Sequence, residues 1–369
     1  MYDYSIFSFF CYNNPMENKK IITTNLQKLT KNQLLKIGQA HKLDVKQSMK
    51  KNEIADEICN VLEDHFKHDA NYFLIHDFLF YVSIIVNYYF TWYEKDFLEY
   101  LKEIPLLKSY KLEHKDGQML FEKGYLLLIT GRDKQQHIII HKPLNDYLLE
   151  KVNEMTLKAI NNEKIDFFMT ALANLYGCYS LRQFLHIWNK YNQKDKMTEE
   201  QAIAFCDEMN KRKVHYWFNG DYIIHRLIDE YELDELLEQA ENKPYYTPTM
   251  GEIEIYAHNL IDKTTTAYKK IAGFFNTHKG GLNPNAREEI IFRVATAFKF
   301  NSKPQDLFKI INSMHYNFEG EKTLADFNDM LNFSANNTRK WVNRGATPKE
   351  LFERFEKPLM KDLPKKPWK

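Results

Sequence analysis

The residues of this sequence best suited to chemistry are lysines that gather near its beginning. Between Leu26 and Leu62 there are seven lysines against four acidic residues, a net charge of +3. Ammonium groups on a small folded unit bind the phosphates of DNA or RNA without reading the base sequence. We therefore predict a nucleic-acid-binding surface made by Lys31, Lys36, Lys42, Lys46, Lys50 and Lys51.

Three further basic clusters lie near expected turns or helix ends and would add phosphate contacts. They are Arg132 with Lys134, then Lys211, Arg212 and Lys213, and finally Arg339, Lys340 and Arg344. Trp341 lies inside the last cluster, where a cation–π contact would support a bound phosphate. The alternative is a Trp341 side chain packed against the preceding helix, with its basic neighbours in water.

The chain as a whole carries almost no net charge. Its 369 residues include 51 Lys and Arg and 50 Asp and Glu, which leaves a formal charge of +1. No long-range field draws such a molecule to a polyanion, so any attraction must be local. Glycine (12) and proline (11) are scarce while aromatic residues reach 15%, which favours a mostly helical fold with only small β-hairpins.

The sequence contains none of the common catalytic signatures. The patterns GxxxxGK[ST], HExxH and GxSxG are absent, as is GxGxxG after a strand. The cysteines are Cys11, Cys59, Cys178 and Cys206. Their wide spacing predicts free thiols in a reducing cytoplasm rather than a zinc site or disulfides. We predict a non-enzymatic protein without metal or cofactor, while an active site assembled from distant residues stays open.

The lysine-rich stretch is expected to form a module over residues 23–68, after a disordered arm over 1–22. Its apolar spacing predicts two short amphipathic helices joined by an extended piece. Thr30 is placed to cap the first helix, and the second is expected to start near Ser48.

Two winged-helix-like units are expected next, over residues 70–160 and 161–242. The first has helices over 73–90 and 93–104, followed by two strand-like runs over 119–130 and 136–141. His137 and His141 would share one face of the second run, as edge decoration rather than as metal ligands.

The second winged unit has the clearer pattern. A capping box formed by Thr198 and Gln201 starts its third helix, and a hairpin is expected around Asn219-Gly220. The third helix of such a unit commonly enters the DNA major groove. Here it carries the carboxylates Glu199, Glu200, Asp207 and Glu208. Phosphates would repel these groups, so we expect at least one winged unit to be a scaffold.

The remainder is expected to be a helical domain over residues 243–357, followed by a flexible tail over 358–369. Pro244 and Pro248 mark its beginning, because proline disfavours a continued helix. Its first element is predicted to be one long helix over residues 252–275. The tail is rich in lysine and proline.

Two parts of the chain resemble known families. The stretch LQKLTKNQLLKIGQAHKLDVKQSMKKNEIADEICNVL resembles the N-terminal domain of transcription terminator Rho and the related SAP modules. That resemblance implies a helix-extended-helix unit that binds nucleic acid. The runs NLYGCYSLRQFLHIW, KPYYTPT and NNTRKWVNRGATPKELF look like uncharacterised bacterial proteins that often end in a SEC-C zinc tail, which this chain lacks, so no metal ligand is implied.

These features together predict a cytoplasmic protein that regulates transcription by binding DNA or RNA. The Rho-N/SAP-like module would tether a helical, partner-binding body to the nucleic acid. The alternative is a protein–protein adaptor or inhibitor, of the kind that phages and plasmids encode, without nucleic-acid binding. No membrane association is expected, because the longest apolar stretch, residues 73–90, is interrupted by His76 and Asp77, and the part that remains, residues 78–90, is too short to cross a bilayer.

Overall fold

The computed structural model describes residues 15–88, 117–130, 134–212 and 214–360. The arm before residue 15, the helix expected over 93–104, the tail from 361, and Arg132 and Lys213 lie outside the described residues. Within them the fold is mostly helical with two small antiparallel sheets, which confirms the predicted fold class. The chain divides into two compact units, residues 1–165 and 166–369, and the division falls inside one helix, α9 (Val152–Tyr176).

The first unit packs its helices around a hairpin. Its elements are α1 (Pro15–Leu26), α2 (Lys31–Ala40), α3 (Lys51–Ala70), α4 (Ile75–Tyr88), α7 (Gln118–Glu122), β1 (Leu126–Thr130), β2 (Gln136–Ile140), α8 (Lys142–Glu150) and the first part of α9. One continuous apolar core runs from Ile22 to Ala159. The expected module boundary near residue 69 therefore falls within a shared core.

Local capping explains where α2 and α3 begin. Thr30 and Gln33 form a reciprocal capping box, so the predicted cap at Thr30 is confirmed. The helix α3 starts at Lys51 rather than near Ser48, because residues 46–49 form a turn and the Glu53 carboxylate accepts the Lys50 backbone N–H. Residues 15–22, expected in the arm, belong to α1 and bury Ile22.

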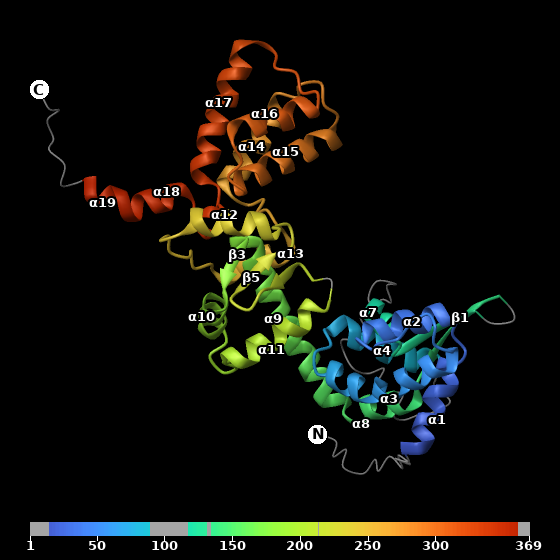
Figure 1. Cartoon of the computed structure of the whole chain (residues 1–369). Helices are drawn as coiled ribbons and strands as arrows, with labels where there is room; N and C mark the ends of the chain where they lie inside the picture. Colours follow the sequence, from blue (N-terminus) through green and yellow to red (C-terminus); the bar gives the residue numbers. More distant parts are fainter. Residues whose placement is uncertain (1–14, 89–116, 131–133, 213, 361–369) are drawn as a thin grey trace, which may run out of the picture. The chain divides into compact units, whose positions relative to one another are not determined.

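The second unit begins with a winged-helix order of elements. The end of α9 leads to β3 (Cys178–Ser180), α10 (Leu181–Tyr191), α11 (Glu199–Asn210), β4 (Tyr216–Phe218) and β5 (Tyr222–His225), which group together in Figure 1. The strands form an antiparallel sheet in the order β3-β5-β4. The predicted Thr198–Gln201 capping box is present. The hairpin turn also forms where predicted: Gly220 has a φ of +106°, and Asn219 Oδ1 accepts two backbone N–H groups.

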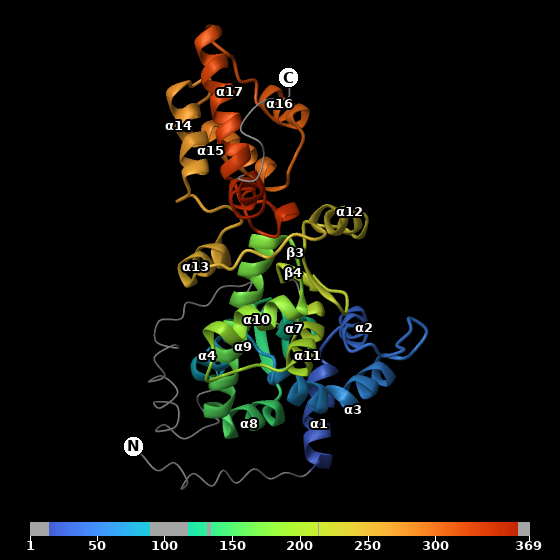
Figure 2. The ribbon, with the colours of Figure 1, turned by 90° about the vertical axis from the view of Figure 1, so that its left-hand side faces the viewer.

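The rest of the second unit is helical. It contains α12 (Glu230–Ala240), α13 (Met250–His258), α14 (Thr266–Thr277), α15 (Pro284–Lys299), α16 (Pro304–Ser313), α17 (Gly320–Asn337), η3 (Trp341–Asn343), α18 (Pro348–Leu351), η4 (Phe352–Glu356) and α19 (Lys357–Met360). The helices α14 to α17 lie together in both views (Figures 1 and 2) and enclose their own apolar core.

Two further sequence predictions about elements are wrong. The single helix expected over 252–275 is two helices, because Asp262 accepts the Thr264 N–H and Thr265 caps α14, bonds that compete with a continuous helix. The strand expected over 119–130 begins as the helix α7, and only Leu126–Thr130 pairs with β2. Among the described residues, no helix is both long and apolar enough to span a membrane.

Candidate nucleic-acid interface

The segment between α2 and α3, residues 42–50, carries three exposed lysines and is called the basic joint below. Lys42, Lys46 and Lys50 recur at every fourth position in it, and all three side chains are exposed. Lys42 has a left-handed backbone, with a φ of +57°, which turns the chain away from α2. The exposed Lys36 on α2 adds a fourth ammonium group to the same part of the unit.

Close packing fixes the backbone of the basic joint. Val45 is buried against Gly38 of α2, where a Cβ would lie 2.6 Å from a Val45 methyl group. Two lysines of the predicted set hold the surrounding chain: Lys31 Nζ donates to the Gln47 carbonyl (2.5 Å) and Lys51 Nζ to the Gln27 carbonyl (2.7 Å). Lys31 and Lys51 thus have structural contacts, and we do not carry them into the interface.

The remaining ammonium groups are available to a ligand. Lys46 Nζ lies 3.0 Å from the Asp44 carboxylate, but both side chains are more than half exposed, and such surface pairs contribute little. Within the described part of the chain, Lys36, Lys42 and Lys50 make no side-chain hydrogen bond or ion pair. The interface therefore consists of Lys36, Lys42, Lys46 and Lys50.

A buried histidine anchors the end of α2, directly before the basic joint. His41 Nε2 donates a hydrogen bond of 2.8 Å to the Lys123 carbonyl. Because a neutral imidazole carries only one N–H, His41 Nδ1 must then accept the 2.8 Å hydrogen bond from His65 Nδ1. Burial is the main cause that lowers the pKa of His41 to about 4, which keeps the ring neutral near pH 7. The neutral ring joins the end of α2 to the turn before β1.

The region expected to form the second winged unit offers a less favourable surface for DNA. Its helix α11 exposes Glu199, Glu200 and Asp207, and Lys211 at its end forms an ion pair with Glu208. Arg212 of the same cluster is half-buried. Because carboxylates oppose phosphates, this helix does not complement a DNA groove. In the first unit, Lys134 is exposed in the hairpin loop with a φ of +63°.

The basic residues around Trp341 are occupied by the fold. The Arg339 guanidinium stacks on the Tyr246 ring (3.5 Å to the centroid) and forms ion pairs with Glu252 (3.0 Å) and Glu350 (2.9 Å). Lys340 Nζ donates to Asn301 Oδ1 (2.9 Å), and the Arg344 guanidinium lies 4.6 Å from the Tyr245 ring centroid. We therefore leave Arg339, Lys340 and Arg344 out of the interface.

Trp341 itself packs deep inside the second unit. Its indole N–H donates to the Asn174 carbonyl at the end of α9 (3.1 Å), and its ring centroid lies 4.3 Å from that of Phe300. A Cβ on Gly177 would be 2.4 Å from the indole, so only glycine leaves it room. Trp341 is thus buried, as the packing alternative expects, but its hydrogen bond and its ring contact go to Asn174 and Phe300 rather than to the preceding helix α17. Its neighbours Arg339, Lys340 and Arg344 contact protein groups rather than water alone.

Sequence reasoning missed a polar cluster in the second unit, formed by Tyr256, Asp262 and Lys299 around a small cavity. A lysine in an amphipathic helix is normally read as a solvated residue, and no motif links the three positions. Comparison of the chain with protein-family models, with curated proteins and with solved structures finds no match. The resemblance of the first module to the Rho N-terminal domain therefore stays a prediction.

Proposed function

We propose that this protein is a non-enzymatic, cytoplasmic regulatory protein that binds nucleic acid through Lys36, Lys42, Lys46 and Lys50. A single observation carries the proposal: these ammonium groups are exposed on a closely packed helix-extended-helix unit, and only Lys46 has an acidic neighbour in contact. The helical second unit would recruit or regulate a protein partner once the chain is tethered to DNA or RNA.

The expected binding is electrostatic and independent of base sequence. Ammonium–phosphate contacts release counterions from the nucleic acid, so affinity falls steeply as salt concentration rises. Glu53, Asp56 and Glu57 are exposed on the neighbouring helix α3 and weaken the local field. We therefore expect this surface alone to bind nucleic acid weakly. Specificity for particular nucleic-acid sites would come from the protein partner that the second unit recruits.

The test compares two variants that lose the same charge. Lys42→Gln/Lys50→Gln removes two exposed groups of the interface, and Lys269→Gln/Lys270→Gln removes two exposed lysines of α14. Fluorescence anisotropy with labelled single- and double-stranded DNA and RNA measures affinity over a range of salt. The first variant should weaken binding and lower the slope of log K against log salt by roughly one per lysine.

The control variant should bind like the wild-type chain. An equal loss of nucleic-acid affinity in both variants would show a general effect of charge and would contradict the proposed interface. A wild-type chain that binds none of the four nucleic acids in a salt-dependent manner would overturn the proposed function.

A protein–protein adaptor or inhibitor is the second candidate, and a groove in the second unit favours it. The groove has a volume of about 350 Å³, and its lining includes the apolar Leu236, Phe300 and Trp341 together with the exposed Glu232 and Glu235. Leu227 at the groove is 58% exposed. An adaptor predicts a partner that is retained from nuclease-treated lysate and lost with Leu227→Glu, whereas loss of the partner on nuclease treatment favours the first candidate.

A further inference from the structure

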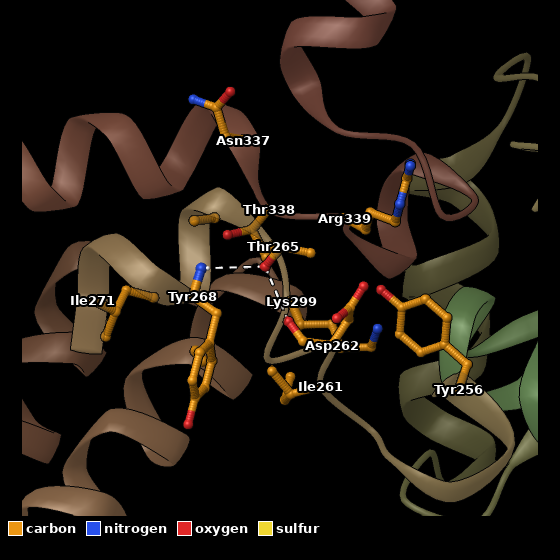
Figure 3. A pocket seen from close by; sticks show the side chains of 12 residues that line it. Tyr256, Ile261, Asp262, Thr265, Tyr268, Ile271, Lys299, Asn337, Thr338 and Arg339 are labelled. Carbon is orange, nitrogen blue, oxygen red and sulfur yellow. Dashed lines mark hydrogen bonds between the residues drawn. The ribbon is translucent and has the colours of Figure 1, made fainter. Parts of the chain in front are cut away.

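A small cavity lies in the second unit beside the break between α13 and α14. Its volume is about 30 Å³, and its walls come from α13, the loop after it, α14, α15 and the residues that follow α17 (Figure 3). Roughly 10–15 Å³ is enough for one water molecule, so this cavity has room for about two waters or for a molecule of very few heavy atoms. Ile261, Ala267 and Ala295 make part of the wall apolar.

Lys299 is a buried lysine in the wall of this cavity. Lys299, in the last turn of α15, is only 2% exposed, and its Nζ makes no hydrogen bond or ion pair among the described residues. Its Nζ lies over the ring of Tyr256, 4.7 Å from the ring centroid. An ammonium group with three unused donors is costly to bury, because it loses its water.

Further polar groups meet at the same place. Thr338 Oγ1 is buried without a hydrogen-bond partner, and it lines the cavity. Figure 3 shows the side chains of Lys299, Asp262 and Tyr256 converging from three different segments. One Asp262 carboxylate oxygen accepts from the backbone and hydroxyl of Thr264, both at 2.7 Å. A site with such unpaired groups is built for a polar occupant rather than for core packing.

The charges around Lys299 favour its neutral form. Burial is the main cause that lowers the pKa of Lys299 to about 7, and the positive charge of Arg339 lowers it further. The negative charge of Asp262 raises the pKa of Lys299. Two other titratable side chains also lie near Lys299, Tyr256 on α13 and the neutral His225 on β5. Near pH 7 the free amine, which is the form that acts as a nucleophile, is therefore far more populated for Lys299 than for an ordinary lysine.

We propose that Lys299 is a reactive amine whose cavity takes up a small aldehyde and binds it covalently as an imine. The amine nitrogen attacks the carbonyl carbon and a C–N bond forms, while the carbonyl oxygen receives a proton to give a carbinolamine. Loss of that hydroxyl group together with a nitrogen proton releases one water and leaves the C=N bond, so no oxidant or reductant is consumed. Tyr256 and Thr338 supply hydroxyl donors to the carbonyl oxygen, and Asp262 is the nearby carboxylate that can exchange the protons.

A carbonyl compound fits this site better than a small anion. The Asp262 carboxylate is 8% exposed and forms part of the cavity wall, so it would repel an anion at short range. A neutral aldehyde suffers no such repulsion, and its alkyl end meets the apolar side of the cavity. The small volume restricts the occupant to the shortest aldehydes.

The experiment labels the full wild-type chain with acetaldehyde in the presence of cyanoborohydride, which reduces an imine to a stable ethyl adduct. Peptide mass mapping then gives the labelling rate of each lysine, with the exposed Lys263 and Lys303 as internal comparators. An exposed lysine is neutral in only roughly one molecule in 2,500 at pH 7. Lys299 should therefore be labelled about tenfold faster or more, since its larger neutral fraction outweighs its lower basicity.

Three measurements test whether the cavity causes the reactivity of Lys299: the pH profile of labelling, the variant Asp262→Asn and labelling with benzaldehyde. Labelling of Lys299 should reach half its maximum near pH 7. Asp262→Asn removes the charge that raises the pKa of Lys299, so its midpoint should move to lower pH. Benzaldehyde, which is too large for the cavity, should show no preference for Lys299. If Lys299 in the wild-type chain is labelled no faster than Lys263, or if benzaldehyde labels it as selectively as acetaldehyde, the proposal is overturned.

Discussion

Two lysine- and arginine-rich segments of this molecule look alike in sequence and differ completely in the fold. In the basic joint, Lys42 and Lys50 are exposed, and their side chains form no hydrogen bond or ion pair with any described residue. In residues 339–344, called the Trp341 segment below, Arg339 is 14% exposed and lies between two glutamates and a tyrosine ring. The availability of a cation for a ligand is thus set by the acceptors that the fold brings to it, and not by the local density of basic residues.

The Trp341 segment gives the largest expected effect. Trp341→Ala removes the contact with Phe300 and leaves the buried Asn174 carbonyl without its donor. We expect a loss of about 3–5 kcal/mol in the free energy of unfolding, measured by urea denaturation of the full chain. Lys349→Ala, an exposed change nearby on α18, should stay within about 0.5 kcal/mol. A similar small change for Trp341→Ala would mean that this segment does not hold the second unit together.

The free energy of unfolding should decrease in acid because of His41, the buried histidine directly before the basic joint. The pKa of His41 is about 4 in the folded chain and about 6.5 when unfolded. Between these values the unfolded state binds a proton that the folded state does not, so stability is complete above pH 6.5 and declines as pH falls toward 4. Each such histidine contributes a slope of up to about 1.4 kcal/mol per pH unit.

The variant His41→Gln tests this origin of the pH dependence. Unfolding free energies of the variant should decrease less between pH 7 and pH 5 than those of the wild-type chain. His186→Gln, a change at an exposed histidine of α10, should keep the wild-type pH dependence. If His41→Gln also keeps it, then His41 is not the responsible group.

Packing within the α2–α3 module gives a somewhat smaller effect. A side chain at Gly38 collides with Val45, so Gly38→Val should destabilise the first unit by about 1–3 kcal/mol in thermal or urea unfolding. The added substitution Val45→Ala makes room and should restore part of that loss. No restoration in the double variant would argue that the strain arises elsewhere.

The smallest effect is expected at the surface of the basic joint. Asp44→Asn removes the exposed pair with Lys46 and should change stability by less than about 0.5 kcal/mol. The same change removes a negative charge from the proposed interface, so affinity for nucleic acid should increase slightly in the anisotropy assay. Asp234→Asn, on the exposed face of α12, should leave both quantities unchanged. A decrease in affinity with Asp44→Asn would place the binding surface elsewhere.

Local signals in the sequence predicted local structure well. The cap at Thr30, the capping box at Thr198 and the turn at Asn219-Gly220 depend on side chains and backbone groups within three residues, and all three form. The break between α13 and α14 was missed, although Asp262 and Thr265 were visible as capping residue types. Apolar residues on both sides of the break kept a helical spacing, which concealed it.

Residue types and short spacings therefore determined the helical class of this chain, its hairpins and the local excess of lysine in one segment. Tertiary structure alone decided that Lys31, Lys51 and Arg339 contact protein groups while Lys42 and Lys50 are exposed, and that Lys299 lies buried in the same cavity wall as Asp262. The reason is physical: a charged group is stabilised or left exposed by the atoms within a few ångströms of it, and for these side chains those atoms come from distant parts of the chain.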